Sequence, residues 1–460
     1  MATFLTCLYR RETRQTCFLA VLALLSTLSR KNSWTLAEEA GLDGPQRIQR
    51  LCRTACGDWC EIRKRSLRYA RDLLAEPSGI LVVDETGFLK AGDHSAGVQR
   101  QYTGTAGKTE NCQVGVFVSY QSSRGRCLIH QRLYMPRKWM NDPERCRKVH
   151  LPEDVRMQTK PAMAADMLDE IRSEGISAEW VAGDEVYGGN PTFRKRLIEA
   201  GQKFVLTIKS TERMWTRQPE MTVRRLRSGR IERKRYALGP QLRSAKDTVS
   251  AFAPRRWWRL KVDEGSKGPR VYDWAAKRVV HCEANEQPGY SFWLLARRST
   301  KKSDEIAYYL CHAPAKTALL TLARVASARW GVEESIKDGK QEVGLDDYQV
   351  RSWVGWHRWM QLCTLALLWL TSLKTSSDVL RIEALEVSAG MTWSIAEIRR
   401  LFLIEMQLPP LSVEFRRRWA RWRASHNLKA RVSHYKRRGF TFQAGFPSSV
   451  VVLLAHVDRL

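Results

Sequence analysis

The apolar residues of this chain fall into short runs, and their spacing predicts alternating strands and helices between residues 79 and 208. Runs rich in β-branched and aromatic residues predict strands, and Pro and Gly mark the ends of the helices. The predicted elements, in order, are strands at 80–83, 112–120 and 126–134, a helix at 161–175, a strand at 179–182, a helix at 191–200 and a strand at 204–208. This order predicts an α/β fold with helices on the faces of a mixed sheet.

The segments that flank this region differ from it in composition and in hydrophobic pattern. Residues 209–304 are rich in Trp, Arg and Lys and contain short strand-like pieces, which predicts an inserted β domain. These pieces are Trp257–Val262, Arg270–Trp274 and Ser291–Ala296. Helical patterns resume near Asp304 and continue to about Leu373. The tail from Phe415 to Arg438 is basic and aromatic, so it either contacts a DNA backbone or forms a solvated surface.

The first 75 residues predict short helices. Thr35 and Glu38 have the spacing of a capping box, Gly41 ends that helix, and Asp43-Gly44-Pro45 begins another. The polar surface of the second helix would carry Gln46, Arg47, Gln49, Arg50 and Arg53. Two interpretations fit this pattern: a helix-turn-helix that reads DNA ends, or a small helical bundle packed on the main domain.

Charge then indicates the class of partner. The chain has 460 residues, with 77 Lys and Arg against 48 Asp and Glu, which gives a formal net charge of +29. Such a surface binds DNA or RNA even without reading sequence, because each neutralised phosphate releases condensed counterions. A basic protein that is merely soluble, or a structural binder like those of ribosomes, is the alternative.

Cysteine usage and hydropathy indicate the compartment. The 11 Cys are scattered without the spacing of a disulfide framework, and we find no secretory leader, so we expect a reducing cytosol. The apolar segment Cys17–Leu28 follows several arginines but is too short to span a bilayer, which needs about 20 residues. We therefore expect no membrane-spanning segment.

Three acidic residues stand where metal-dependent phosphodiester chemistry would need them. Asp84 and Asp184 each follow an apolar run that predicts a strand, and Glu333 lies in a helical pattern with basic neighbours. If the two strands are adjacent, both aspartates meet at one edge of the sheet. Two divalent ions about 3.5–4 Å apart can activate an oxygen nucleophile and stabilise a leaving oxygen, and Mg²⁺ prefers carboxylate oxygens. Taken singly, each Asp is more simply a cap or turn residue.

The helix that carries Glu333 also carries two cations. Arg329 lies one turn before Glu333 and Lys340 two turns after it, and spacings of three and four place these residues on or near one face. They are suited to holding phosphates. The simpler interpretation of this segment alone is an amphipathic helix with internal ion pairs, such as Glu333 with Lys337.

Taken together, the three blocks resemble the DDE-type transposases of insertion sequences, in the branch whose third block has a Y-(2)-R-(3)-E-(6)-K signature. Arg329, Glu333 and Lys340 stand at the R, E and K positions, whereas Ala326 replaces the Tyr. The first block begins at VDETGF and the second at GDEVYGG. The resemblance covers roughly residues 20–370, and relatives in this branch carry a β-rich insertion between the second and third blocks.

The resemblance implies an RNase H-like catalytic core that cuts DNA at the ends of an insertion sequence and joins the 3′-hydroxyl ends to target DNA. It implies that Asp84, Asp184 and Glu333 bind two Mg²⁺ (or Mn²⁺) and that Arg329 and Lys340 contact DNA phosphates. Adjacent side chains on a strand point to opposite faces, so we expect each block to supply one ligand. The neighbours expected to point away are Glu85, Glu185 and Glu334.

The predicted organisation combines these elements. The regions are 1–76, helical and a candidate for DNA-end binding; 77–208, the first part of the core; 209–304, the basic β-rich insertion; 305–375, the helical completion of the core; and 376–460, basic and helical. Expected partners are double-stranded DNA, both terminal inverted repeats and target, and a second copy in a DNA-bound synaptic dimer. We expect a cytoplasmic, nucleoid-associated prokaryotic protein. A catalytically silent DNA-binding relative and a nuclease without strand transfer are the alternatives.

Overall fold

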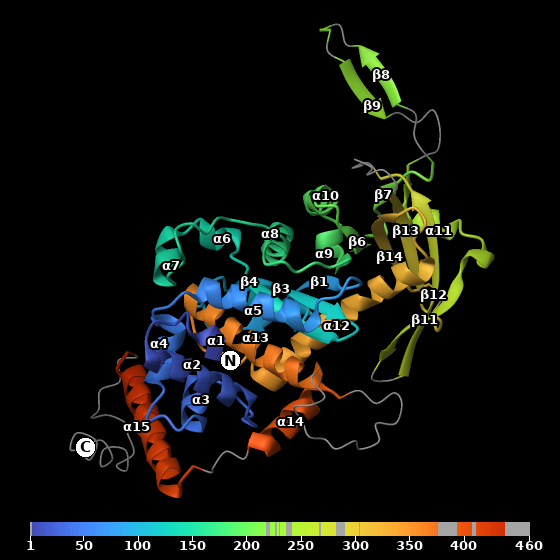
Figure 1. Cartoon of the computed structure of the whole chain (residues 1–460). Helices are drawn as coiled ribbons and strands as arrows, with labels where there is room; N and C mark the ends of the chain where they lie inside the picture. Colours follow the sequence, from blue (N-terminus) through green and yellow to red (C-terminus); the bar gives the residue numbers. More distant parts are fainter. Residues whose placement is uncertain are drawn as a thin grey trace.

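A ten-stranded sheet forms the centre of the part of the chain that the structure describes (Figure 1). The computed structural model describes residues 2–217, 221–225, 228–229, 231–235, 242–265, 268–281, 290–302, 304–375, 393–406 and 411–437. The strands of this sheet are β1 (Ile80–Leu89), β2 (Gln99–Thr103), β3 (Lys108–Ser122), β4 (Gly125–Leu133), β5 (Trp180–Gly183), β6 (Lys203–Ile208), β11 (Trp258–Gly265), β12 (Gly268–Val279), β13 (Tyr290–Arg298) and β14 (Ile306–Pro314). Their order is β11-β12-β13-β14-β6-β5-β1-β3-β2, with β4 also paired to β3.

Five adjacent strands, β4-β3-β1-β5-β6, have an RNase H-like arrangement. Strand β3 is antiparallel to both β4 and β1, whereas β5 and β6 run parallel to β1. All four residues of β5 are buried, as is typical of a parallel strand covered on both faces. The predicted α/β class with an RNase H-like mixed sheet is therefore confirmed.

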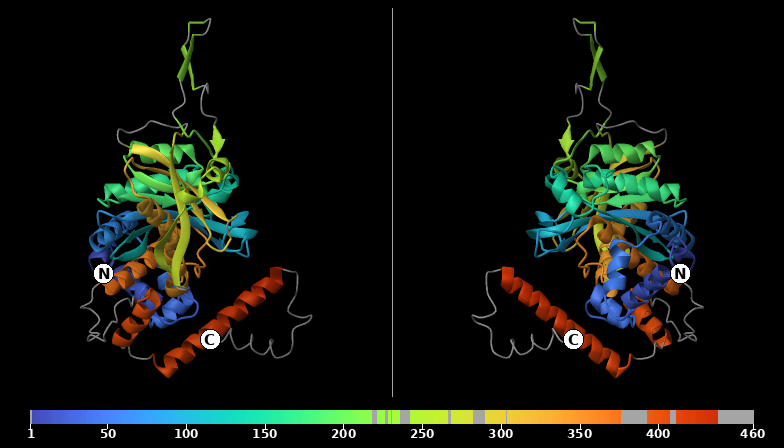
Figure 2. Two further views of the ribbon diagram at one scale, coloured as in Figure 1. Left: turned by 90° about the vertical axis from the view of Figure 1, so that its right-hand side faces the viewer. Right: turned by 90° about the vertical axis from the view of Figure 1, so that its left-hand side faces the viewer.

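Helices cover both faces of this sheet. In Figures 1 and 2, α8, α9 and α10 lie on one face, and α12 and α13 lie on the other. The helices are α1 (Ala2–Leu5), α2 (Arg11–Leu25), α3 (Ser33–Glu39), α4 (Gln46–Arg53), α5 (Trp59–Leu74), α6 (Arg137–Met140), α7 (Pro143–Lys148), α8 (Lys160–Ser173), α9 (Glu185–Gly188), α10 (Pro191–Glu199), α11 (Ala245–Ser250), α12 (Leu319–Val343), α13 (Trp353–Thr375), α14 (Ile395–Met406) and α15 (Val413–Arg437). None of these helices is both long enough and apolar enough to cross a bilayer.

The strands of the predicted insertion extend the core sheet. The three predicted strand-like pieces correspond to β11, β12 and β13, although β11 begins one residue later, at Trp258. These strands form an antiparallel meander with β14. Strand β14 pairs with β6, so the meander continues the hydrogen-bonded ladder of the core. The prediction that helices resume near Asp304 is wrong, because residues 306–314 form β14 and the next helix begins at Leu319. The run of β-branched, aromatic and apolar residues at 306–311 favours a strand.

Two short antiparallel pairs lie outside the main sheet, within residues 213–244. Strand β7 (Arg213–Met214) pairs with β10 (Arg243–Ser244), and β8 (Met221–Arg225) pairs with β9 (Ile231–Arg235). In Figure 1 the β8–β9 hairpin extends away from the remainder of the structure. Residues 376–392, 407–410 and 438–460 of the predicted C-terminal region lie outside the described residues.

The N-terminal helices show both features that the sequence left as alternatives. Helices α2, α4 and α5 pack against α13, as in a bundle on the main domain, while α3 and α4 are joined by a short turn, as in a helix-turn-helix. The predicted capping box of Thr35 with Glu38 is wrong. The side chain of Asn32 accepts from the backbone of Thr35, and the Thr35 hydroxyl accepts from the backbone of Asn32, so the helix begins three residues earlier.

Close packing of α9 on β6 generates a prediction. A Cβ at Gly188 would lie 1.9 Å from the carbonyl oxygen of Thr207, so Gly188→Ala must push α9 away from β6. We expect a loss of roughly 1–3 kcal/mol in the free energy of unfolding, as for other overpacked sites. Urea unfolding followed by circular dichroism measures it. Gly104→Ala is the control, because a Cβ at Gly104 meets nothing within 4 Å. Equal stability of the two variants would contradict the packing argument.

Candidate active site

Asp84, within β1, and Asp184, directly after β5, meet where the parallel ladder of these two strands ends. In the register of these strands Val83 is opposite Gly183, so Asp84 and Asp184 follow at equivalent positions. Asp184 is the N-cap of α9, and its side chain accepts a 2.9 Å hydrogen bond from the backbone nitrogen of Val186. One carboxylate oxygen each from Asp84, Asp184 and Glu85 lie within 4.8 Å of one another. The predicted convergence of Asp84 and Asp184 is thus observed, although β1 continues past Asp84 to Leu89 instead of ending before it.

Burial and mutual repulsion raise the pKa values of these two acids. Burial is the main cause for Asp84, and the charge of Asp184 adds to it, which raises the pKa of Asp84 to about 7. Burial and the charge of Glu85 raise the pKa of Asp184 to about 6. A bound cation relieves such repulsion, and clustered carboxylate oxygens are the donors that Mg²⁺ prefers. The donor set therefore fits a hard divalent cation.

Arg329 connects the third predicted acid to this pair. Its guanidinium lies 2.9 Å from a carboxylate oxygen of Glu333 and 3.9 Å from one of Asp84. The side chain of Glu333 is 50% exposed, and Glu333 is not a member of the close carboxylate group. The structure thus places Glu333 on α12 beside the aspartate pair, with a cation between them.

Lys340 lies two turns further along α12 and is held by the first block. Its ammonium donates to the hydroxyls of Thr86 at 3.0 Å and Thr105 at 3.4 Å and to the carbonyl of Gly87 at 3.5 Å. Burial lowers the pKa of Lys340. In this arrangement Lys340 fastens α12 to β1 and to the turn after β2.

Sequence comparisons agree with the geometry of the site. The profile of a family described as "DDE superfamily endonuclease" matches residues 3–269, which is more than half of the chain. The chain belongs to the DDE superfamily of endonucleases. This finding confirms the family expected from the three blocks. The matched range contains Asp84 and Asp184 and ends before Arg329, so the third block is placed by its position in the structure.

A curated relative matches part of this DDE superfamily chain. It is named "Probable transposase for insertion sequence element IS701", from Microchaete diplosiphon, and is 26% identical over 241 residues. The alignment covers 52% of this chain and 60% of the relative. The chain therefore matches less than two thirds of the relative's length.

The expectation that Glu85 points away from Asp84 is wrong. Glu85 belongs to the close carboxylate group, although it follows Asp84 directly. Strand β5 pairs with β1 only as far as Val83, so β1 has no neighbouring strand on that side beside Glu85. The side chain of Glu85 can therefore reach the aspartates past the end of β5. The other two neighbours lie outside the group: Glu334 pairs with Arg126 and Arg270, and exposed Glu185 lies 3.9 Å from Lys209.

Two further residues beside the carboxylates were missed by sequence reasoning. Lys160, the first residue of α8, lies 2.7 Å from one oxygen of Glu85, and the buried Tyr187 hydroxyl donates to the other at 2.8 Å. Tyr187 is three residues after Asp184, so its place in the second block was a usable signal. Lys160 carries no local signal, because its partner is 75 residues away in the sequence.

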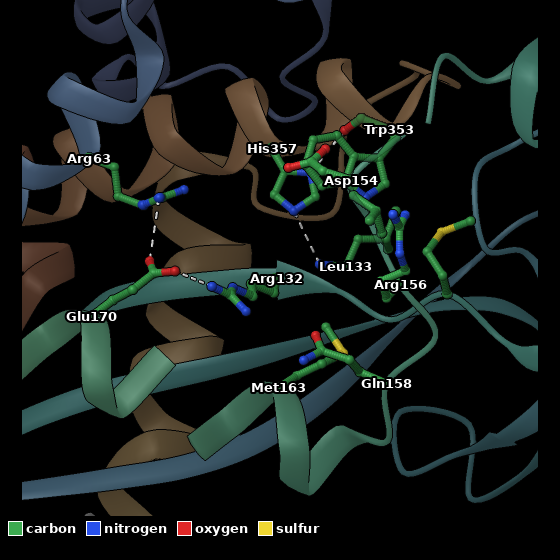
Figure 3. A pocket seen from close by; sticks show the side chains of 12 residues that line it. Arg63, Arg132, Leu133, Asp154, Arg156, Gln158, Met163, Glu170, Trp353 and His357 are labelled. Atoms are coloured by element: carbon green, nitrogen blue, oxygen red, sulfur yellow. Dashed lines mark hydrogen bonds and ion pairs between the residues drawn. The ribbon is translucent and has the colours of Figure 1, made fainter. Parts of the chain in front are cut away.

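A separate cavity of about 420 Å³ lies against β4, α5, α8 and α13 (Figure 3). Its carboxylate Glu170 pairs with Arg63 and Arg132, as the dashed lines in Figure 3 show, and with the buried His130. His357 accepts a hydrogen bond from the backbone of Leu133. The Glu170 carboxylate is already matched by cations, which distinguishes it from the aspartate pair.

The raised pKa values predict how a divalent cation affects stability. Without one, both acids bind protons more tightly in the folded than in the unfolded state, so stability should fall as pH rises from about 4 to about 7. Mg²⁺ binds the deprotonated carboxylates, so it should raise the melting temperature more at about pH 8 than at about pH 5. Differential scanning fluorimetry with millimolar MgCl₂ measures this difference.

The control for this measurement is a pair of variants. Asp84→Asn should remove most of the Mg²⁺ effect, whereas Asp93→Asn should retain it, because the Asp93 side chain is 81% exposed and lies outside the carboxylate group. An equal Mg²⁺ effect in both variants would contradict a cation site at Asp84.

Proposed function

We propose that this protein is a DNA transposase that cuts at the ends of an insertion sequence and joins the freed 3′-hydroxyl ends to target DNA. One observation carries the proposal: Asp84 and Asp184 converge, and the guanidinium of Arg329 lies between Asp84 and Glu333. Membership of the DDE superfamily and the name of the IS701 relative support it. The net charge of +29 suits a polyanionic substrate.

In this proposal Asp84, Asp184 and Glu333 hold two Mg²⁺ (or Mn²⁺). When bound, such ions would activate the attacking oxygen and stabilise the leaving oxygen of the phosphodiester. Glu333 would join the two aspartates by leaving its ion pair with Arg329. The half-exposed side chain of Glu333 has room for this change, because no other partner holds it among the described residues.

Arg329 and Lys340 are proposed to bind DNA phosphates. Arg329 neutralises Asp84 and Glu333, and a guanidinium binds phosphate and carboxylate with the same two-pronged geometry. A phosphate beside the site can therefore replace the carboxylates as its partner. Lys340 would add charge at the floor of the site while it fixes β1 through Thr86.

The proposed substrate is double-stranded DNA, first the terminal inverted repeats and then the target. The helix-turn-helix of α3 and α4 is the candidate for reading the repeats, since α4 exposes Gln49, Arg50 and Arg53. Bringing two ends together requires a DNA-bound dimer. We further propose a cytoplasmic, nucleoid-associated location in a prokaryote.

Two alternatives differ from the proposal in the reaction that they allow. A silent DNA-binding relative needs no carboxylates, so the presence of Asp84 and Asp184 together, with Glu333 on the other side of Arg329, favours catalysis. A nuclease without strand transfer would use the same acids but release only cut ends. Incubation with DNA that carries the element's ends, followed by mapping of cut and joined products, separates the two.

The carboxylates give the sharpest test of the proposal. Asp184→Asn should reduce cleavage of end DNA by roughly a thousandfold, because the ions contribute several kcal/mol and each 1.36 kcal/mol is tenfold in rate. Asp84→Asn and Glu333→Gln should behave alike, and all three should still bind end DNA. Glu185→Gln is the matched control, since the neighbouring Glu185 lies outside the carboxylate group. Full cleavage by the Asp184 variant would refute its assignment.

A further inference from the structure

The basic C-terminal helix α15 is anchored on the helix-turn-helix. Trp419 is 1% exposed, and its indole nitrogen donates a 2.8 Å hydrogen bond to the carbonyl of Leu42, in the turn between α3 and α4. The ring of Trp422 packs edge-on against Trp34 of α3 at 4.9 Å, and His426 contacts the same ring at 4.7 Å. The order of these contacts shows that α15 runs antiparallel to α3.

Two arginines of α15 form ion pairs with the helix-turn-helix, and two others are exposed. Arg418 pairs with Asp43 at 2.7 Å, and Arg423 pairs with Glu38, so these two face the helix-turn-helix. Arg417 and Arg421 are exposed and, among the described residues, have no acidic partner. They are four residues apart, which places them on one face of the helix.

The composition of α15 makes this exposed face costly without a partner. Its basic residues are Arg416, Arg417, Arg418, Arg421, Arg423, Lys429, Arg431, Lys436 and Arg437, against the single acid Glu414. Like charges at spacings of three and four destabilise a helix. An anion along the helix would relieve that repulsion, and a polyanion would relieve it at several residues together.

A basic cavity lies beside the N-terminal end of α3, where Trp34 contacts α15. It has a volume of about 360 Å³ and is lined by residues of α3, α4, the end of α7 and the segment before α13. Its lining residues are Ser33, Trp34, Gln49, Arg53, Lys148, His150, Gln349, Val350, Arg351 and Ser352, and none of them is acidic. Trp34 both lines this cavity and holds α15, so the cavity and the helix are adjacent.

We infer that α4, this cavity and the outer face of α15 together hold duplex DNA at the element's end. The exposed polar residues of α4 read base edges, while Arg417 and Arg421 of α15 and the cavity's Lys148 and Arg351 bind phosphates. The inference rests on the proposed function and assigns the C-terminal helix to end recognition. The anchoring tryptophans explain how a helix remote in sequence joins the helix-turn-helix.

The test compares two double variants of the full-length protein. Arg417→Ala with Arg421→Ala should weaken binding to an end duplex by about tenfold and reduce the salt slope by about two, because each lost phosphate contact contributes about 0.9. The loss should be equal on an unrelated duplex, since phosphates carry no sequence. Fluorescence anisotropy at several KCl concentrations measures both. The control is Arg124→Ala with Lys195→Ala, two exposed cations on the β3–β4 turn and α10.

A second variant tests base readout. Gln49→Ala with Arg53→Ala should lower the preference for the end duplex over the unrelated one. Wild-type affinity and salt slope in the α15 variant, or a loss no greater than in the control, would overturn the inference. Far-ultraviolet circular dichroism checks that α15 remains helical. Cleavage of the same end duplex by the wild-type protein tests the proposed function separately, so failure of either can be recognised.

Discussion

The parallel pairing of β1 with β5 imposes the constraint around which the site is built. The register brings Asp84 and Asp184 to equivalent positions, so two partly buried carboxylates lie close together. Their repulsion is costly in a poorly solvated site unless cations lie nearby. Arg329 supplies one positive charge from α12, and Lys160 supplies another beside Glu85 from α8. Helices on both faces of the sheet thus contribute to the electrostatic balance of this edge.

Helix α12 can carry the third block only because it approaches the sheet closely. Gly331, Ser335 and Gly339 recur every fourth residue, so they form one narrow face of small side chains. A Cβ at Gly331 would meet the amide of Gln121 at 2.5 Å, and the hydroxyl of Ser335 lies 3.3 Å from that of Ser119. This packing sets the depth of α12, and Arg329 and Lys340 reach β1 from it.

Local sequence patterns predicted the features that depend on residues close together in the sequence. Apolar runs that end in an acid located Asp84 and Asp184, and the order of elements predicted the RNase H-like sheet. Contacts between distant segments were not predictable in this way. The partners of Glu85 come from residues 75 and 102 positions away, and the pairing of β14 with β6 joins segments about 100 residues apart. Both Asn32 and Thr35 have side chains that can cap a helix. Asn32 is the N-cap of α3, in keeping with the stronger preference for Asn at this position.

The continuity of the sheet has a consequence for shortened forms of this chain. Strands β11, β12 and β13 hydrogen-bond in sequence to β14, so their excision would turn β14 into an outer strand. Its buried Leu310 and Cys311 would lose the neighbours that β13 provides, and a row of unpaired backbone groups would face solvent. A truncated protein of this kind would be prone to self-association. The meander therefore covers the edge of β14 and moves the outer edge of the sheet to β11.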